Sequence, residues 1–160
     1  MSAMSEPTLG ELRAERNRLH EQEDVVSFAR RLAQGRLDLV RAEREMRARR
    51  DNRDISGELP SILGRLASGS DRPPRDTDVP ADHPLLTELD QVCVPLGFDN
   101  LKTCTDEQLL QLRDVLTEYE HARSMERQEL FERIDELTAD LVRRYQLGAP
   151  IEGLLDDTNA

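Results

Sequence analysis

The sequence predicts an all-α protein, an antiparallel coiled-coil hairpin of two long helices with short helices and a mobile linker between them. Apolar residues recur every seven positions in two long stretches, and neither stretch contains a proline. Aromatic residues make up only 3% of the chain and Trp is absent, which leaves little material for a β-sheet core. The 160 residues suffice for a single helical domain, 1–160.

The first long helix is expected over residues 8–50. Thr8 can cap its start, and Glu11, three residues later, can reach back to complete a capping box. The expected apolar seam repeats at intervals of seven without a slip: Leu12, Leu19, Val26, Ala33 and Val40. Arginines crowd the last turns, where cations suit the helix dipole.

The middle of the chain, 51–104, reads as a linker with short helices. One short helix is expected over 58–66 and another over 84–92, separated by a polar, proline-rich stretch, 69–84, that is expected to be mobile. Leu96-Gly97-Phe98 is expected to form a turn.

The second long helix is expected over 105–148. Thr105 and Gln108 form a second capping box, and Gly148 ends the helix before the short acidic tail 149–160. Its seam repeats at seven: Leu109, Leu116, Arg123, Leu130 and Leu137. An antiparallel pairing of the two helices is favoured, although the linker is long enough to permit a parallel one.

The two helices carry the same polar motif. Written E-x3-S-x2-R-x3-Q-x3-D, it places five side chains on a stripe about 80° wide and about 22 Å long beside the apolar seam. The first copy is Glu23, Ser27, Arg30, Gln34 and Asp38, and the second, 97 residues later, is Glu120, Ser124, Arg127, Phe131 and Asp135. One such stripe is ordinarily interpreted as a solvated charged face. Two copies with the same spacing, both at the seam, make that interpretation less favoured.

Charge in the seam points to a binding site. With the motifs level in an antiparallel hairpin, like charges are expected opposite one another: Arg30 with Arg127, Glu23 with Asp135, and Asp38 with Glu120. A level parallel pairing also places like-charged side chains beside one another. Either arrangement is therefore expected to need a bound partner that compensates these charges. That partner is expected to be two-fold symmetric, anionic at its centre and equipped with hydrogen-bond donors at both ends. A guanine-based cyclic dinucleotide fits, although the residues alone ask only for a symmetric, anion-centred ligand.

The repeated motif, together with S-F-A-R-R-L-A-Q-G-R-L-D-L at 27–39, resembles the RsiG family of cyclic di-GMP-dependent anti-sigma factors from actinobacteria. The resemblance covers both long helices. It implies that the hairpin binds cyclic di-GMP through the ten motif residues, as an intercalated dimer of two ligand molecules. It also implies that the loaded protein sequesters a sigma factor of the WhiG or flagellar type and represses its transcription. A chain with two motif copies resembles the family's monomeric members.

Phe131 departs from the motif, because the first copy has Gln34 at this position. The phenyl ring can pad the seam or stack on a guanine, and padding is favoured. In either case an amide contact is lost from the second copy, which puts equal affinity of the two halves in doubt.

Other classes of function are disfavoured. The net charge of −11 argues against direct binding to DNA or an anionic membrane and suits a basic protein surface. No signal peptide or membrane span is evident, so a cytoplasmic location is expected. Cys93 and Cys104 are read as reduced structural thiols, and no metal or catalytic cluster is seen. A constitutive coiled-coil adaptor without a small ligand is the main alternative, and an enzyme acting on nucleotides is a distant third.

Overall fold

The computed structural model describes residues 5–52 and 78–148, and no strand occurs among them. The elements are α1 (Leu9–Asp51), α3 (Pro84–Cys93), two 3₁₀ helices η1 (Val94–Leu96) and η2 (Phe98–Thr103), and α4 (Asp106–Gln146). The predicted all-α class is confirmed for this part of the chain, and none of its helices is long and apolar enough to cross a membrane. The short helix expected over 58–66 and most of the proline-rich stretch lie outside the described residues.

Both long helices begin at the predicted capping boxes. The Glu11 backbone N–H donates to Thr8 Oγ1 at 3.2 Å, and the Thr8 N–H donates to the Glu11 carboxylate at 2.7 Å. Thr105 and Gln108 make the same reciprocal pair at 3.1 and 2.8 Å. Each box satisfies two N–H groups that the first turn of a helix otherwise leaves without partners, which fixes where the helix starts.

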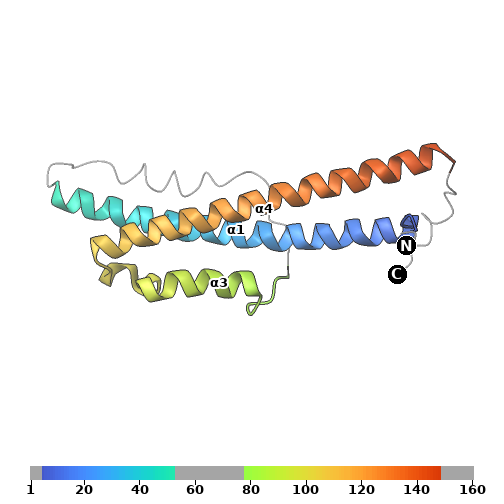
Figure 1. Cartoon of the computed structure of the whole chain (residues 1–160). Helices are drawn as coiled ribbons and strands as arrows, with labels where there is room; N and C mark the ends of the chain where they lie inside the picture. The colour runs from blue at the N-terminus through green and yellow to red at the C-terminus, as the bar shows by residue number, and fades with distance from the viewer. Residues whose placement is uncertain (1–4, 53–77, 149–160) are drawn as a thin grey trace.

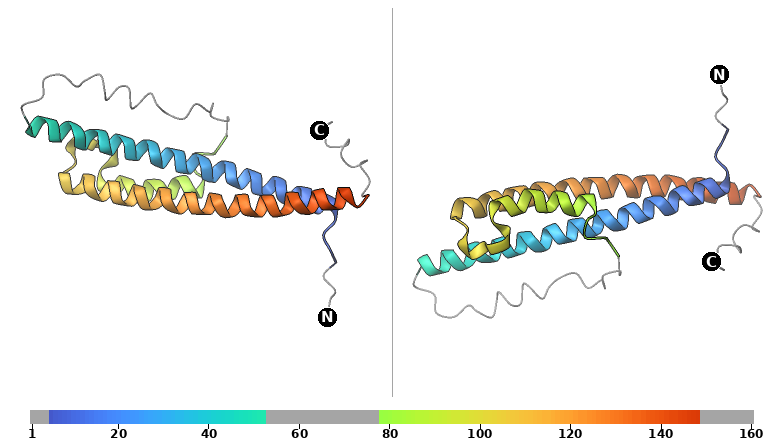
Figure 2. Two further views of the ribbon diagram at one scale, coloured as in Figure 1. Left: turned by 90° about the horizontal axis from the view of Figure 1, so that it is seen from above. Right: turned by 90° about the horizontal axis from the view of Figure 1, so that it is seen from below.

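α1 and α4 lie side by side and run in opposite directions along the whole molecule (Figures 1 and 2). Arg13 near the start of α1 donates through Nε to the Tyr145 hydroxyl near the end of α4, at 2.9 Å. At the other end, Arg47 of α1 donates to Asp106 in the first turn of α4, at 2.9 Å. The antiparallel direction therefore agrees with the expectation, whereas the supercoiled packing of a true coiled coil stays a prediction.

Two apolar clusters hold the helices together. The three-helix cluster, where α3 packs against α1 and α4, consists of Ala29, Ala33, Leu37, Val40, Leu86, Leu89, Cys93, Cys104, Leu109, Leu112, Leu116 and Tyr119. The two-helix cluster lies between the start of α1 and the end of α4 and consists of Leu12, Leu19, Ile134, Leu137 and Leu141. All five expected seam residues of the first helix are buried. In the second helix, by contrast, Arg123 and Leu130 are only half-buried, so its seam is interrupted midway.

α3 covers one half of the rod and is fixed there by polar contacts as well as apolar ones (Figure 1). Its start, at the predicted Pro84, is capped by His83, whose Nδ1 accepts from the Leu85 N–H at 3.2 Å. The Tyr119 hydroxyl of α4 donates to the Leu85 carbonyl at 2.7 Å, and Arg36 of α1 donates to Asp90 at 2.6 Å. These contacts join all three helices at the same end of the molecule.

The two cysteines are free and buried, as expected of structural thiols. Burial raises the pKa of the Cys93 thiol, which keeps it protonated and unreactive. Cys104 Sγ donates to the Gly97 carbonyl at 3.1 Å, inside the tight turn expected around Gly97. Gly97 has φ +89°, and a Cβ there would lie 2.9 Å from that sulfur, so the turn requires glycine.

Candidate functional site

A polar belt separates the two apolar clusters. Along α4 no side chain is buried between Tyr119 and Ile134. On α1 the corresponding stretch includes Glu23, which is only 6% exposed and lies in the same seam as Leu19 and Val26. The belt consists of Glu23, Ser27, Arg30, Gln34, Glu120, Ser124, Arg127 and Phe131, which are eight of the ten residues that the motif predicted.

The Glu23 half of the belt (Glu23, Ser27, Arg127 and Phe131) is closely bonded. Arg127 Nε donates to the Glu23 carboxylate at 3.0 Å and to the Ser27 hydroxyl oxygen at 2.9 Å. The Ser27 hydroxyl in turn donates to the same Glu23 oxygen. A buried carboxylate without a cation would be costly, and Arg127 supplies the cation together with a directed hydrogen bond.

The Glu120 half (Glu120, Ser124, Arg30 and Gln34) repeats this arrangement with looser contacts. Ser124 donates to the Glu120 carboxylate at 2.8 Å, as its counterpart does in the other half. Arg30 reaches the same carboxylate only through Nη1, at 3.4 Å, and the Gln34 amide donates to it at 3.2 Å. All three donors converge on the single oxygen Oε1.

The two halves are related by a local two-fold axis across the helix pair. In the repeat, Glu23 is equivalent to Glu120, and Arg30 is equivalent to Arg127. The cross-helix contact of Glu23 with Arg127 is therefore equivalent to the contact of Glu120 with Arg30. The serine-to-glutamate bond within each helix is repeated in the same way. The expected two-fold relation between the motif copies thus agrees with the geometry.

The expected juxtaposition of like charges is wrong. Arg30 was expected to face Arg127 but contacts Glu120, and Glu23 was expected to face Asp135 but contacts Arg127. The side-chain partners on α4 lie about two turns nearer its start than the level pairing implied. Acids and arginines of the belt therefore neutralise one another, and the helix pair does not require a third party to offset repulsion.

Asp38 and Asp135 are the two motif residues that lie outside the belt. Both are exposed, and Asp38, at 62% side-chain exposure, has its nearest ion-pair partner, Arg41, 4.0 Å away on its own helix. They flank the belt on its solvent side, where a carboxylate keeps its hydration and its capacity to accept further hydrogen bonds.

Phe131 contacts both an apolar surface and a charge. It packs against the two-helix cluster, which agrees with the interpretation that it pads the seam. The Arg127 guanidinium carbon lies over its ring, 4.7 Å from the ring centre, which is the geometry of a cation–π contact. The motif pattern did not predict this second contact, because it depends on Arg127 turning toward α1.

Arg30 has a donor that the described part of the chain leaves unsatisfied. Its Nε is buried and has no hydrogen-bond partner within the described residues, whereas the equivalent atom of Arg127 has two acceptors. An unsatisfied buried donor costs about 1–3 kcal/mol, so an additional acceptor at this position would be stabilising. A phosphate oxygen is such an acceptor, and arginine is the side chain that binds it best.

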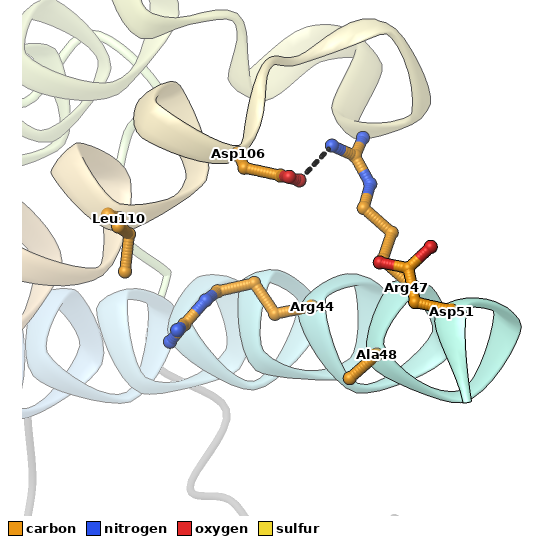
Figure 3. A pocket seen from close by; sticks show the side chains of 6 residues that line it. All are labelled: Arg44, Arg47, Ala48, Asp51, Asp106 and Leu110. Carbon is orange, nitrogen blue, oxygen red and sulfur yellow. Dashed lines mark hydrogen bonds and ion pairs between the residues drawn. The ribbon is translucent and has the colours of Figure 1, made fainter.

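A pocket of about 230 Å³ lies elsewhere, between the end of α1 and the start of α4. Figure 3 shows the six residues that line it: Arg44, Arg47, Ala48, Asp51, Asp106 and Leu110. Arg47 is engaged there by Glu43 and Asp106, both at 2.9 Å, and by the Leu101 carbonyl at 3.1 Å. Those contacts fix the segment that leads into α4 against α1, so we assign the pocket a structural role. Reasoning from sequence missed it because its residues follow no motif.

Comparison with known proteins bears on the first helix. A family model described as RsiG-like matches residues 1–63, a stretch that contains all of α1 and the complete first copy of the motif. The second copy, on α4, lies outside the match. No curated protein and no solved structure matches the chain. Over residues 1–63, the family match confirms the resemblance to the RsiG family that the five-residue motif predicted.

Proposed function

We propose that this protein is an anti-sigma factor that binds cyclic di-GMP at the polar belt and, when loaded, sequesters a sigma factor of the WhiG or flagellar type. The protein acts as a monomer in the cytoplasm, and the ligand is an intercalated dimer of cyclic di-GMP held by the ten motif residues. The observation that carries the proposal is the pair of symmetry-related arginines in the belt, one of which has a buried donor without an acceptor among the described residues.

Binding is an exchange of partners within the belt. Arg30 and Arg127 release the two glutamates and bind phosphate oxygens, with help from Ser27 and Ser124. The released carboxylates of Glu23 and Glu120 then accept from the N1–H and N2–H₂ donors of guanine. The two arginines of the belt pair with two of the four phosphate charges that a cyclic di-GMP dimer carries, and each freed glutamate accepts from guanine donors.

The exposed acids, Asp38 and Asp135, complete the site at its two ends. Each follows its arginine by eight residues, slightly more than two turns of helix, on the solvent side of the belt. A guanine that extends outward from a central phosphate ring would bring its donor edge toward them. The motif order of acid, hydroxyl, base, amide and acid thus follows the sequence of groups along the ligand.

The ligand controls the sigma factor by joining α1 to α4. It contacts residues of both helices, so it favours the arrangement in which both halves of the belt can close on it. A sigma factor that binds this arrangement better than others is then bound more tightly when cyclic di-GMP is present, and the coupling is reciprocal. The net charge of −11 suits the basic DNA-facing surfaces of a sigma factor, whose occupation blocks promoter contact.

A constitutive coiled-coil adaptor is the alternative that one observation favours. Both cross-helix acid–arginine pairs form from the chain's own side chains, so the belt holds together without a ligand. In that account the repeated motif sets the alignment of the two helices and binds nothing else. Buried polar pairs that specify helix alignment are well attested in coiled coils.

Thermal unfolding with and without cyclic di-GMP separates the two accounts. A ligand at one hundred times its Kd stabilises the folded state by about 2.7 kcal/mol, which shifts the unfolding midpoint of a domain this size by several degrees. We expect cyclic di-GMP to raise the midpoint in this way. An unchanged midpoint at saturating nucleotide would favour the adaptor.

A further inference from the structure

The two halves of the belt differ where the repeat departs from itself. Gln34 in the Glu120 half is replaced by Phe131 in the Glu23 half. Gln34 donates to the acid of its half, whereas Phe131 lies beneath the arginine of its own. One substitution in the repeat therefore changes which charged group is held most firmly.

We propose that Phe131 is a positioning residue that holds Arg127 against Glu23 and Ser27, so that the Glu120 half engages an anionic ligand before the Glu23 half does. The order of engagement rests on the proposed function. The positioning of Arg127 does not, because it is a property of the protein alone.

Arg127 is fixed from three sides. Its Nε donates to Glu23 at 3.0 Å and to Ser27 at 2.9 Å, and its guanidinium lies 4.7 Å from the centre of the Phe131 ring. The ring is itself held by packing against the two-helix cluster, so it cannot follow the guanidinium if Arg127 moves. To bind a ligand phosphate, Arg127 must lose at least part of this set.

Arg30 has less to lose. Its contact with Glu120 is 3.4 Å long, and its buried Nε has no hydrogen-bond partner in the described part of the chain. Glu120 also keeps another donor, the Gln34 amide, when Arg30 turns away. Exposure alone would rank the arginines the other way, since Arg127 is 38% exposed and Arg30 24%. The bonds that must break decide the order of engagement, because both side chains can reach solvent.

The first experiment needs no ligand and follows exchange of the arginine Nε–H protons with water by NMR. Phe131→Leu keeps an apolar side chain on the cluster and removes the aromatic ring. It should speed exchange at Arg127 about two- to fivefold, the equivalent of one partly exposed cation–π contact, and leave Arg30 unchanged. Phe131→Tyr, which keeps the ring, should exchange like the unaltered protein. Phe131→Gln, which introduces the residue found at the equivalent position 34, should change exchange as Phe131→Leu does. It replaces Phe131→Leu in the experiment if that variant folds poorly.

The second experiment adds cyclic di-GMP and follows the same two signals. The Arg30 signal should reach half its shift at about a two- to fivefold lower nucleotide concentration than the Arg127 signal, and Phe131→Leu should bring the two midpoints together. Coincident midpoints in the unaltered protein, or Arg127 responding first, would overturn the proposed order. Equal exchange at Arg127 in the unaltered protein and in Phe131→Leu would overturn the positioning role.

The two proposals fail in different ways. If cyclic di-GMP shifts neither signal, the proposed function is wrong and the order of engagement falls with it, while the exchange rates still decide what Phe131 does. If the nucleotide binds and Phe131→Leu leaves both the exchange rates and the midpoints unchanged, the proposed function stands and the inference about Phe131 is wrong.

Discussion

Replacement of Arg30 by alanine is expected to weaken cyclic di-GMP binding by about ten- to a hundredfold while the protein stays helical. Charge-assisted hydrogen bonds are worth about 1.5–3 kcal/mol each. Arg30 offers the ligand two donors: a loosely held Nη1, and a buried Nε that has no partner within residues 5–52 and 78–148. Calorimetric titration measures the affinity, and circular dichroism checks the helices.

Arg31→Ala is the matched control for this substitution. Arg31 is the next residue of the same helix, is exposed, and lies outside the belt, so its removal changes the net charge equally. We expect an affinity close to that of the unaltered protein. Equal losses of affinity in the two variants would mean that Arg30 acts only through long-range attraction. An unchanged affinity in Arg30→Ala would show that the belt is not the binding site.

The largest effect on stability is expected from Leu112→Ala. Leu112 is fully buried in the three-helix cluster, where α1, α3 and α4 meet. Removing a buried leucine side chain costs about 2–5 kcal/mol, because its transfer energy is lost and the surrounding helices cannot close over the cavity. Urea unfolding measures the loss as a lower midpoint with little change in slope.

Leu137→Ala shows whether that cost depends on the third helix. Leu137 lies in the two-helix cluster and is 8% exposed, so water and neighbouring side chains can fill part of the space it leaves. We expect a loss toward the lower end of the same range, about 2 kcal/mol. A larger loss at Leu137 than at Leu112 would show that the two-helix end, not the three-helix end, dominates stability.

Local signals predicted the helices well because capping and heptad spacing act within a few residues. Thr8 and Thr105 each precede their helix by one residue, and the reciprocal bonds that the sequence predicted are present at both. The short helix beginning at Pro84 was also predicted, since proline suits the first turn. The division into a single domain with the expected boundaries stays a prediction.

Partners across the helix pair were predicted less well, because a heptad pattern repeats and so leaves the alignment of two helices ambiguous. The level pairing that set Arg30 opposite Arg127 came from aligning the two motif copies and ignored the reach of an arginine side chain. In the structure Arg30 contacts Glu120 instead, a choice that Coulomb attraction favours and periodicity does not encode. The contact of Arg127 with Phe131 follows from the same reach.

We expect the polar belt to bind a guanine-based cyclic dinucleotide. Calorimetric titration of the purified chain with cyclic di-GMP and, separately, with cyclic di-AMP tests it most directly, because the two share their charge and ring and differ in the base edges offered to the acids. We expect saturable binding of cyclic di-GMP and at least about tenfold weaker binding of cyclic di-AMP, the loss that follows when buried acceptors go unpaired. Equal affinity for both, or no binding of cyclic di-GMP, would contradict it.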